Sequence, residues 1–253
     1  MPTLPALPLA DHAVLVTGGA RRLGAAIARQ LHASGANVLI HYRGSHAEAE
    51  RLGAELNSTR AHSAVLHRAD LLDLGALPGL VAAALAAFGR LDVLVNNAST
   101  FYPTPLGSVT RAAFDDLVGS NLRAPLFLTQ AAAPALKERH GLVLNMVDIH
   151  ATRPLKAHPV YSAAKAGLVM LTQSLARELA PEVRVNAIAP GPVLWPEGAV
   201  DEELKARILE RTALKRMGTP EDVARAALFF VKDAPYVTGQ VLAIDGGRTV
   251  GGL

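Results

Sequence analysis

The sequence predicts an α/β protein in which a parallel sheet is covered by helices. Short apolar runs alternate with segments of helical periodicity along nearly all of the 253 residues, and this alternation is typical of βα units around a parallel sheet. Half of the residues are hydrophobic and 19% are charged, which is enough apolar material for one large core. Neither an internal repeat nor a linker-like stretch divides the chain, so residues 1–253 are predicted to form a single domain.

The first βαβ unit is a candidate nucleotide site. An apolar strand over 13–17 leads into a glycine turn over 18–24, a helix continues to about residue 34, and a second strand covers 37–41. Small residues let the backbone approach a pyrophosphate, and the N-terminus of the helix faces its negative charge. The spacing is not Gly-x-Gly-x-x-Gly, so a tight turn without a ligand stays an alternative.

The end of the second strand favours NADPH over NADH. Residues 41–45 read His-Tyr-Arg-Gly-Ser, with no carboxylate to hold the 2′-hydroxyl of NAD. Arg43, together with Arg22 and Ser45, could instead form charge-assisted hydrogen bonds with a 2′-phosphate. The alternative is that Arg43 is an exposed residue without a ligand. We expect NADPH as the cofactor.

The later elements continue the alternation. Strands are predicted at 63–68, 91–95, 142–147, 183–188 and 241–244, and helices at 78–88, 120–139, 159–180, about 201–211 and from 219–220 onward. The least regular segment, 192–217, contains Trp195 and is predicted to form a substrate cap, although an ordinary connection would have the same composition.

Candidate catalytic and binding residues lie at the carboxyl ends of the predicted strands, where open parallel sheets bind ligands. Asn97 and Asp148 each follow a predicted strand, and the glycine turn follows another. Tyr161 and Lys165 are four residues apart on a predicted helix, so their side chains share one face. A free phenol has a pKa of about 10, and a neighbouring cation is expected to lower it toward the range useful for acid–base chemistry. Tyr-x-x-x-Lys alone could also be a surface pair.

The composition excludes several classes of function. Without cysteine there is no disulfide, thiol nucleophile or cysteine-bound zinc, and His41, His67, His150 and His158 show no metal-ligand spacing. The formal net charge is +3 and the basic residues are scattered, which argues against nucleic-acid binding. The first ten residues resemble no signal peptide, and no apolar run reaches membrane-spanning length. We expect a cytoplasmic protein without a metal, a nucleic-acid partner or a membrane partner.

Seven motifs in this order resemble the short-chain dehydrogenase/reductase family. They are Thr17-Gly18 to Gly24, Asp70-Leu71, Asn96-Asn97-Ala98, Asn121, Tyr161 with Lys165, Pro190-Gly191 and Asp245-Gly246-Gly247. The resemblance implies a doubly wound, Rossmann-type domain with a seven-stranded parallel sheet. It also implies that Tyr161 donates a proton, that Lys165 binds the nicotinamide ribose and lowers the tyrosine pKa, and that Asn121 supports a proton relay. A homotetramer formed through the helices of Asn121 and Tyr161 is implied as well.

Two departures from the general family pattern point to a narrower group. Arg22 replaces the usual glycine before Leu23, and Asp148 replaces the usual serine thirteen residues before Tyr161. A carboxylate would repel the alkoxide that develops when a ketone is reduced. A protonated Asp148 could donate a proton itself, and an ionised one could help Tyr161 to deliver a proton or could orient water. Either role suits protonation of a nitrogen while hydride adds to a C=N bond.

These departures resemble the pteridine reductase branch of the family. The similarity extends over 17–24, 41–45, 97–106, 119–121 and 145–148. The resemblance implies that Phe101 stacks a pterin, since aromatic rings favour offset stacking. It also places Ser99 against pterin and cofactor, and Arg22 near the phosphates and the pterin. The alternative for Phe101 is a loop residue that plugs the core.

The motifs and the resemblance together give the predicted site. The cofactor residues are Gly18, Arg22, Leu23, Gly24, His41, Tyr42, Arg43, Ser45, Asp70, Leu71, Asn97, Ala98, Ser99, Ser120, Tyr161, Lys165, Pro190 and Gly191. The substrate residues are Arg22, Ser99, Phe101, Asp148, Tyr161 and Trp195, and the catalytic residues are Asp148, Tyr161, Lys165 and Asn121.

The predicted function is NADPH-dependent reduction of the C=N bonds of oxidised or dihydro pterins. Biopterin, dihydrobiopterin, dihydrofolate and dihydromonapterin all fit this prediction. A short-chain ketone reductase acting, for example, on 3-oxoacyl thioesters is the main alternative. A non-catalytic NADPH-binding regulator is the other.

Overall fold

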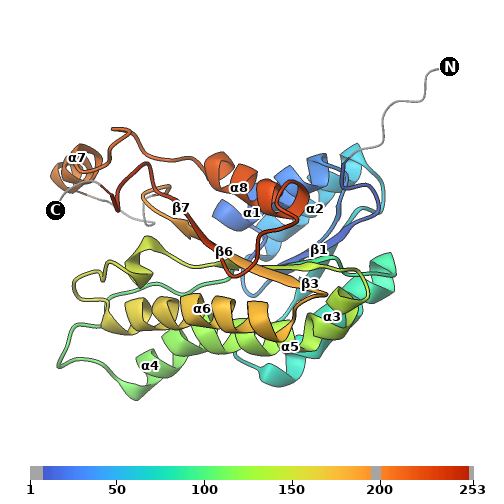
Figure 1. Ribbon diagram of the computed structural model, residues 1–253, viewed down its shortest axis with the longest axis horizontal. Helices are drawn as coiled ribbons and strands as arrows, with labels where there is room; N and C mark the ends of the chain where they lie inside the picture. Colours follow the sequence, from blue (N-terminus) through green and yellow to red (C-terminus); the bar gives the residue numbers. More distant parts are fainter. Residues whose placement is uncertain (1–7, 195–200, 251–253) are drawn as a thin grey trace.

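A seven-stranded parallel sheet forms the centre of the protein. The computed structural model describes residues 8–194 and 201–250 (Figure 1). The strands are β1 (Ala13–Val16), β2 (Asn37–Tyr42), β3 (Ala64–Arg68), β4 (Val93–Asn96), β5 (Leu142–Met146), β6 (Arg184–Pro190) and β7 (Val241–Ile244). Their order is β3-β2-β1-β4-β5-β6-β7 with every pairing parallel. The predicted fold is confirmed. The order reverses between β1 and β4, which makes that crevice the expected ligand site.

Helices cover both faces of the sheet (Figure 1). The helices α1 (Arg22–Ala33), α2 (His46–Thr59) and α8 (Pro220–Lys232) lie on one face, and α3 (Leu77–Phe88), α4 (Arg111–Val118), α5 (Ala124–Lys137) and α6 (Pro159–Glu178) lie on the other. Helix α7 (Glu202–Glu210) lies near the described C-terminal end. Short helical turns occupy Leu74–Ala76, Gly119–Arg123 and Ile149–Ala151.

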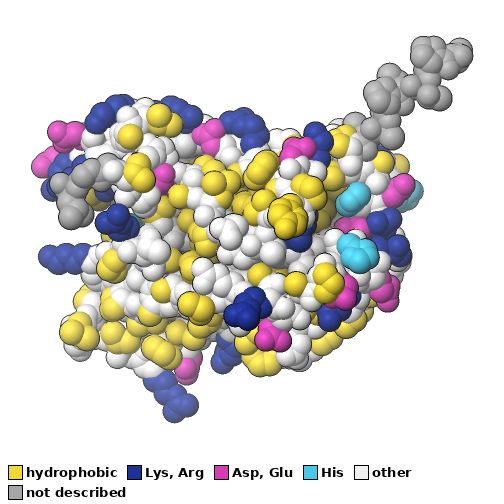
Figure 2. Space-filling model, in the orientation of Figure 1, with side chains coloured by type: hydrophobic (Ala, Val, Ile, Leu, Met, Phe, Trp, Pro, Cys, Tyr) yellow, Lys and Arg dark blue, Asp and Glu magenta, His cyan; other side chains and the backbone are white. Residues whose placement is uncertain are grey.

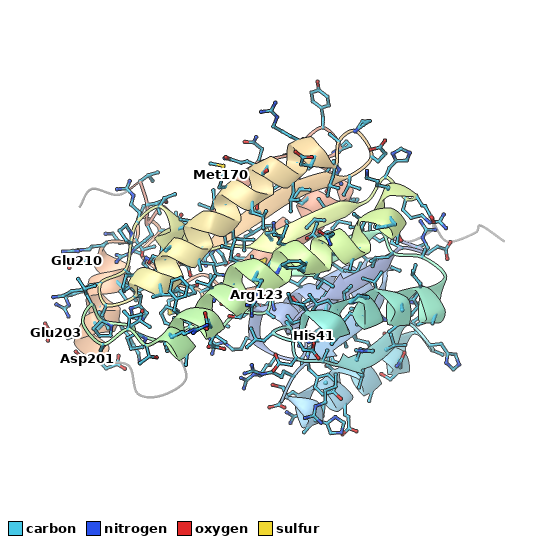
Figure 3. The ribbon with its side chains drawn as sticks, turned by 90° about the horizontal axis from the view of Figure 1, so that it is seen from below. His41, Arg123, Met170, Asp201, Glu203 and Glu210 are labelled. Atoms are coloured by element: carbon cyan, nitrogen blue, oxygen red, sulfur yellow. The ribbon has the colours of Figure 1, made fainter. Side chains whose placement is uncertain are left out.

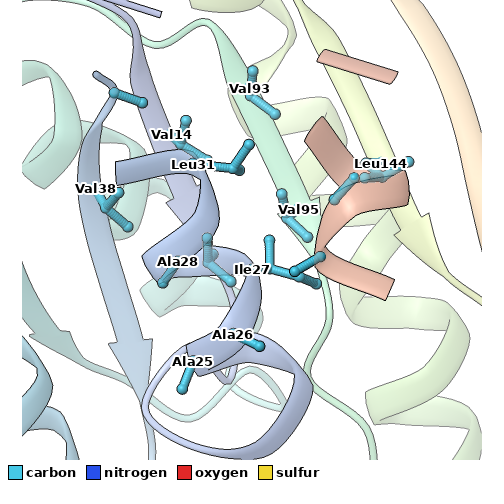
Figure 4. Packing of buried hydrophobic residues seen from close by; sticks show 14 of the residues in the cluster. Val14, Ala25, Ala26, Ile27, Ala28, Leu31, Val38, Val93, Val95 and Leu144 are labelled. Atoms are coloured by element: carbon cyan, nitrogen blue, oxygen red, sulfur yellow. The ribbon is translucent and has the colours of Figure 1, made fainter. Parts of the chain in front are cut away.

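Two apolar clusters, one on each face, hold the layers together. Val14 and Val16 belong to the cluster under α1 and α8, whereas Leu15 belongs to the cluster under α3 and α5. Successive residues of a strand point to opposite faces, so a central strand must be apolar throughout. Figure 4 shows Ile27 and Leu31 of α1 over the strands of the first cluster.

Two helical segments differ from the prediction. Helix α2 is absent from the prediction, although Ala49, Leu52, Gly53 and Leu56 form its buried face. Charged residues and a central glycine weaken the apolar pattern of this helix. The helix predicted from 120 instead belongs to a longer helical stretch that begins at Arg111, after the N-cap Thr110, and passes through a π-helical turn before α5.

The predicted ends of the C-terminal helices agree with the structure. Thr219 caps α8 through a capping box with Asp222, as the sequence indicates. Helix α7 lies within the predicted 201–211, whereas Trp195 and the rest of 195–200 lie outside the described residues. Among the described helices, none is both long and apolar enough to cross a membrane. In Figure 2, Lys and Arg side chains are distributed among acidic and apolar ones.

Truncating Ile27, which is 0% exposed between α1 and the sheet, is expected to destabilise the protein. Ile27→Ala removes buried methyl groups and leaves a cavity, so we expect a loss of about 2–5 kcal/mol in the free energy of unfolding. Leu106→Ala, at a side chain that is 95% exposed, should change it by less than about 0.5 kcal/mol. Urea denaturation measures both, and equal losses would contradict this description of the core.

Candidate active site

A cavity of about 600 Å³ opens at the carboxyl ends of β1, β2 and β4. Most of the predicted cofactor residues line it: Gly18, Arg22, Leu23, Gly24, His41, Tyr42, Arg43, Ser45, Asp70, Leu71, Asn97, Ala98, Ser99 and Ser120. The cavity is also lined by residues that were not among the predicted ones: Ala20, Arg21, Gly44, Glu48, Leu72 and Thr100. Tyr161, Lys165, Pro190 and Gly191 lie outside this lining. The volume suits a ligand larger than a simple anion.

Close backbone packing shapes the glycine turn. A Cβ on Gly24 would lie 2.2 Å from the Gly18 carbonyl oxygen and 2.6 Å from Asn97 Nδ2. That amide nitrogen donates to the carbonyl oxygens of Thr17, at 2.9 Å, and Gly18, at 3.1 Å. Asn97 therefore holds the turn open at the cavity, and Gly24 cannot carry a side chain.

Arg22 occupies a backbone conformation that favours glycine. Its φ is +53°, in the left-handed region, where an ordinary residue costs about 1–2 kcal/mol. This geometry explains why glycine is usual at the position, and the cavity lining includes Arg22. A strained residue beside a ligand cavity points to a functional side chain.

His41 supports the turn with both of its ring nitrogens. Nδ1 accepts a hydrogen bond from the Gly18 N–H at 3.1 Å, and Nε2 donates to the Ala69 carbonyl at 3.1 Å. The residue is 2% exposed and lies among the strands in Figure 3. Burial lowers the pKa of this imidazole to about 4, because the charged form loses hydration. His41 therefore positions the turn in its neutral form.

The region where the cofactor's 2′ group is expected carries both signs of charge. Arg43, whose side chain is 59% exposed, has its Nη1 3.9 Å from Asp70 Oδ1. Ser45 lines this end of the cavity and precedes α2 without making a side-chain cap bond. Glu48, from the first turn of α2, lines the same cavity. This carboxylate was not predicted, because it comes from α2 and not from the end of β2.

The predicted catalytic side chains do meet. Asp148 lies at the carboxyl end of β5, and its Oδ2 accepts a 2.7 Å hydrogen bond from the Tyr161 hydroxyl on α6. Its Oδ1 accepts from the backbone N–H of His150 at 2.8 Å, which fixes the carboxylate. Lys165 Nζ lies 5.8 Å from the centroid of the Tyr161 ring and donates to the Met146 carbonyl at 2.8 Å. Helix spacing thus places phenol and ammonium on one face, as predicted.

The expected direction of the tyrosine pKa is wrong. Burial raises the pKa of the Tyr161 phenol well above its ordinary value, and Asp148 raises it further, while a hydrogen bond with Ser99 acts in the opposite direction. Lys165 is itself buried, which lowers its pKa to about 8. The prediction weighed the cation alone, whereas the fold adds desolvation and a carboxylate. Tyr161 is therefore held as a neutral phenol that can donate a proton.

Asn121 lies beneath the loop that follows β4 and binds two of its residues. It is 0% exposed within the π-helical turn, and its Oδ1 accepts a 2.7 Å hydrogen bond from Ser99 Oγ. Its Nδ2 donates to the Thr100 carbonyl at 2.9 Å. Pro125 has no N–H to donate to the Asn121 carbonyl, which favours the irregular turn. The Asn121 side chain therefore positions the loop after β4.

Phe101 lies at the surface of the site, so the alternative of a core plug is wrong. The residue is 45% exposed. Its ring stacks on His158, with centroids 4.7 Å apart and planes at 11°, and meets Tyr161 edgewise at 4.8 Å and 78°. The sequence offered no signal for the contact with His158, because the two residues are far apart in the chain.

Pro190 and Gly191, the remaining predicted cofactor residues, pack against another part of the chain. Pro190 ends β6, and a Cβ on Gly191 would lie 2.6 Å from Asp245 Cβ. This close contact explains the pairing of Pro190-Gly191 with the Asp245 turn. In the part of the chain that the structure describes, no group of His, Cys, Asp or Glu side chains could hold a metal ion.

The chain matches known proteins over nearly its whole length. A family model described as enoyl-(acyl carrier protein) reductase matches residues 18–249. Pteridine reductase 1 of Leishmania tarentolae is 37% identical over 99% of both chains. The 3-oxoacyl-(acyl-carrier-protein) reductase FabG of Staphylococcus aureus is 35% identical over 92% of this chain and 96% of its own. A solved structure of a blue fluorescent protein from a metagenomic library, in complex with NADPH, has a TM-score of 0.90 at 33% identity and covers 95% of this chain and 99% of that chain.

The fold and the site define an oxidoreductase of the Rossmann type, with a glycine turn and a tyrosine–lysine pair at one rim of the sheet. The chain belongs to the short-chain dehydrogenase/reductase family. The predicted family is confirmed. The pteridine reductase branch stays a prediction, because a pteridine reductase and a 3-oxoacyl reductase are similar to this chain at comparable identity.

Placing a methyl group on Gly24 should impair cofactor binding. In Gly24→Ala the new Cβ clashes with backbone and with Asn97, and such overpacking costs about 1–3 kcal/mol. We expect NADPH, titrated by its fluorescence, to bind at least about 5-fold more weakly. Gly79→Ala, where a Cβ meets nothing within 4 Å, is the matched control. Unchanged affinity in Gly24→Ala would show that the turn does not contact the cofactor.

His41 should make stability depend on pH. The unfolded imidazole takes up its proton near pH 6.5 and the folded one near pH 4, so the unfolded state binds more protons between these values. Its contribution to the free energy of unfolding is present above about pH 6.5 and decreases by up to about 1.4 kcal/mol per pH unit as pH falls toward 4. Denaturation curves of His41→Gln, which does not titrate, should show a smaller slope in this window. Equal slopes in both proteins would contradict the neutral, buried imidazole.

Proposed function

We propose that this oxidoreductase is an NADPH-dependent pteridine reductase. The observation that carries the proposal is the 2.7 Å hydrogen bond between Tyr161 and Asp148. A carboxylate beside the proton donor would repel the alkoxide formed from a ketone, and it favours a substrate whose nitrogen takes up the proton. The candidate substrates are biopterin, dihydrobiopterin, dihydrofolate and dihydromonapterin.

In the proposed reaction, the residues of this chain have two roles: they bind the substrate and they transfer a proton to it. When bound, NADPH supplies the hydride that adds to the carbon of the C=N bond. Tyr161 donates its proton to the adjacent nitrogen, and Asp148 stabilises the phenol and mediates its reprotonation from solvent. Lys165 keeps positive charge near the phenol as the proton leaves. Phe101 offers an exposed aromatic face for the flat substrate.

Two features of the cavity support NADPH as the cofactor. Arg43 is exposed at the end of β2, and the N-terminus of α2 adds N–H groups and a positive dipole for a phosphate. The similar blue fluorescent protein is in complex with NADPH. Glu48, in the same lining, is the feature that would favour NADH. Arg43→Ala should therefore lower kcat/KM for NADPH and leave that for NADH nearly unchanged.

Reduction of 3-oxoacyl thioesters is the second candidate function. The similarity to the FabG protein and the description of the matching family favour it. It lacks a role for Asp148 and for the exposed Phe101, so those two residues discriminate between the candidates. A non-catalytic NADPH-binding regulator is disfavoured by the intact contact between Tyr161 and Asp148.

We also propose a homotetramer formed through α5 and α6. Phe114 of α4, Phe127 of α5 and Met170 of α6 are 49%, 38% and 62% exposed on this side of the chain. Large apolar side chains exposed on neighbouring helices favour association. Light scattering of the purified protein measures the mass, and a monomer at micromolar concentration would contradict the assembly.

Substrate choice is tested by NADPH oxidation with biopterin, dihydrobiopterin, dihydrofolate and an acetoacetyl thioester. We expect turnover with pterins, and a loss of at least about 100-fold in Tyr161→Phe, the usual scale for a missing general acid. Asp148→Ser should lose pterin reduction while its affinity for NADPH stays intact.

Three outcomes would count against the proposal. Wild-type turnover with the thioester but not with pterins would favour the ketone reductase. Unchanged pterin turnover in Asp148→Ser would remove the carboxylate from the mechanism. No turnover with any of the four substrates would favour the regulator.

A further inference from the structure

The Phe101 ring is supported from behind by His158, and no part of the proposed reaction uses this histidine. Their rings lie 4.7 Å apart at 11°, which is an offset-stacked contact. His158 covers part of the Phe101 ring, yet Phe101 is still 45% exposed. The stack therefore leaves aromatic surface available to a ligand.

The imidazole of His158 is held in place by its own segment. Its Nδ1 donates a 2.9 Å hydrogen bond to the Lys156 carbonyl, which fixes the rotation of the ring. The backbone of His158 is the N-cap of α6, and its carbonyl accepts from the Ser162 N–H at 3.0 Å. The ring thus extends from the first turn of the helix that carries Tyr161 three residues later.

The two loops that supply the rings are joined by their backbones. The Thr104 N–H donates to the Ala157 carbonyl at 2.7 Å, close to the stacked pair. Ala157 has φ +63°, an unfavourable conformation for alanine. Thr104 Oγ1 is a buried hydroxyl without a hydrogen-bond partner among the described residues, which is a second local cost. Costs of this kind cluster where a geometry is needed for function.

We propose that His158 is a specificity-determining positioning residue that orients Phe101 for a flat, bicyclic heteroaromatic substrate. The inference rests on the proposed pterin reduction. Because His158 and Tyr161 share one helical turn, the stacking surface and the proton donor are fixed to the same rigid element. A planar substrate stacked on Phe101 is then held at a fixed distance from the Tyr161 hydroxyl. An acyl thioester has no such plane and gains little from the stack.

Two substitutions separate the ring of His158 from its hydrogen bond. His158→Asn keeps a donor for the Lys156 carbonyl and removes the ring, whereas His158→Phe keeps a flat ring and removes the donor. Since a stacked pair contributes on the scale of about 3- to 10-fold in affinity, we expect KM for the pterin to rise by that factor in His158→Asn. kcat should change less than KM, and His158→Phe should restore KM to within about 2-fold. Affinity for NADPH should be the same in both variants.

A double-substitution cycle tests whether His158 acts through Phe101. In the Phe101→Leu background, His158→Asn should add no further increase in KM, because the ring that it orients is gone. His62→Asn, in an exposed turn between α2 and β3, is the matched control and should leave all constants unchanged. Thermal denaturation of each variant reports its folding.

The outcomes separate this inference from the proposed function. If the wild-type protein reduces a pterin but His158→Asn has wild-type KM, or the effects of the two substitutions add, His158 has no positioning role and the function stands. If the wild-type protein neither binds nor reduces any pterin, the proposed function and this inference both fail. A rise in KM, rescued by His158→Phe and absent without Phe101, supports the inference.

Discussion

The site depends on one contact, the 2.7 Å hydrogen bond from Tyr161 to Asp148. It joins the end of β5 to the first turn of α6, so it can form only when sheet and helix are packed in register. Burial of the phenol makes the bond consequential, because a desolvated hydroxyl with a carboxylate partner stays protonated. The proton is thus held on the tyrosine beside a carboxyl group, and in the proposed reaction it passes to a nitrogen of the substrate.

Several polar side chains around the site hold backbone segments in place. Asn97 and His41 hold the glycine turn, and Asn121 holds the loop after β4, each through partly buried hydrogen bonds to backbone groups. These three side chains shape the site by holding the backbone, without any need for contact with a substrate. Parallel strands deliver such groups to one edge, and the change of strand order between β1 and β4 opens the space between them. The cavity is therefore a consequence of topology, and its charge comes from residues at the strand and helix ends.

The aromatic contacts link substrate recognition to the same helix. Phe101 comes from the loop after β4, and its ring contacts both His158, the N-cap of α6, and Tyr161 of α6. An exposed aromatic ring in a loop would ordinarily move between rotamers. Here the stack on His158 and the backbone hydrogen bond from Thr104 to Ala157 restrict it, so contacts between the two loops set the orientation of the Phe101 ring.

The sequence alone determined the βα alternation, the glycine turn and the spacing of Tyr161 and Lys165. Local periodicity and i,i+4 geometry are properties of neighbouring residues, so they can be recognised without the fold. It missed α2, whose apolar face is narrow and interrupted by Gly53, and the start of the helical stretch at Arg111. Only the tertiary structure decided the direction of the Tyr161 pKa, the presence of Glu48 in the cavity and the stack of His158 on Phe101. Desolvation and contacts between distant segments arise when the chain is packed, and no local pattern encodes them.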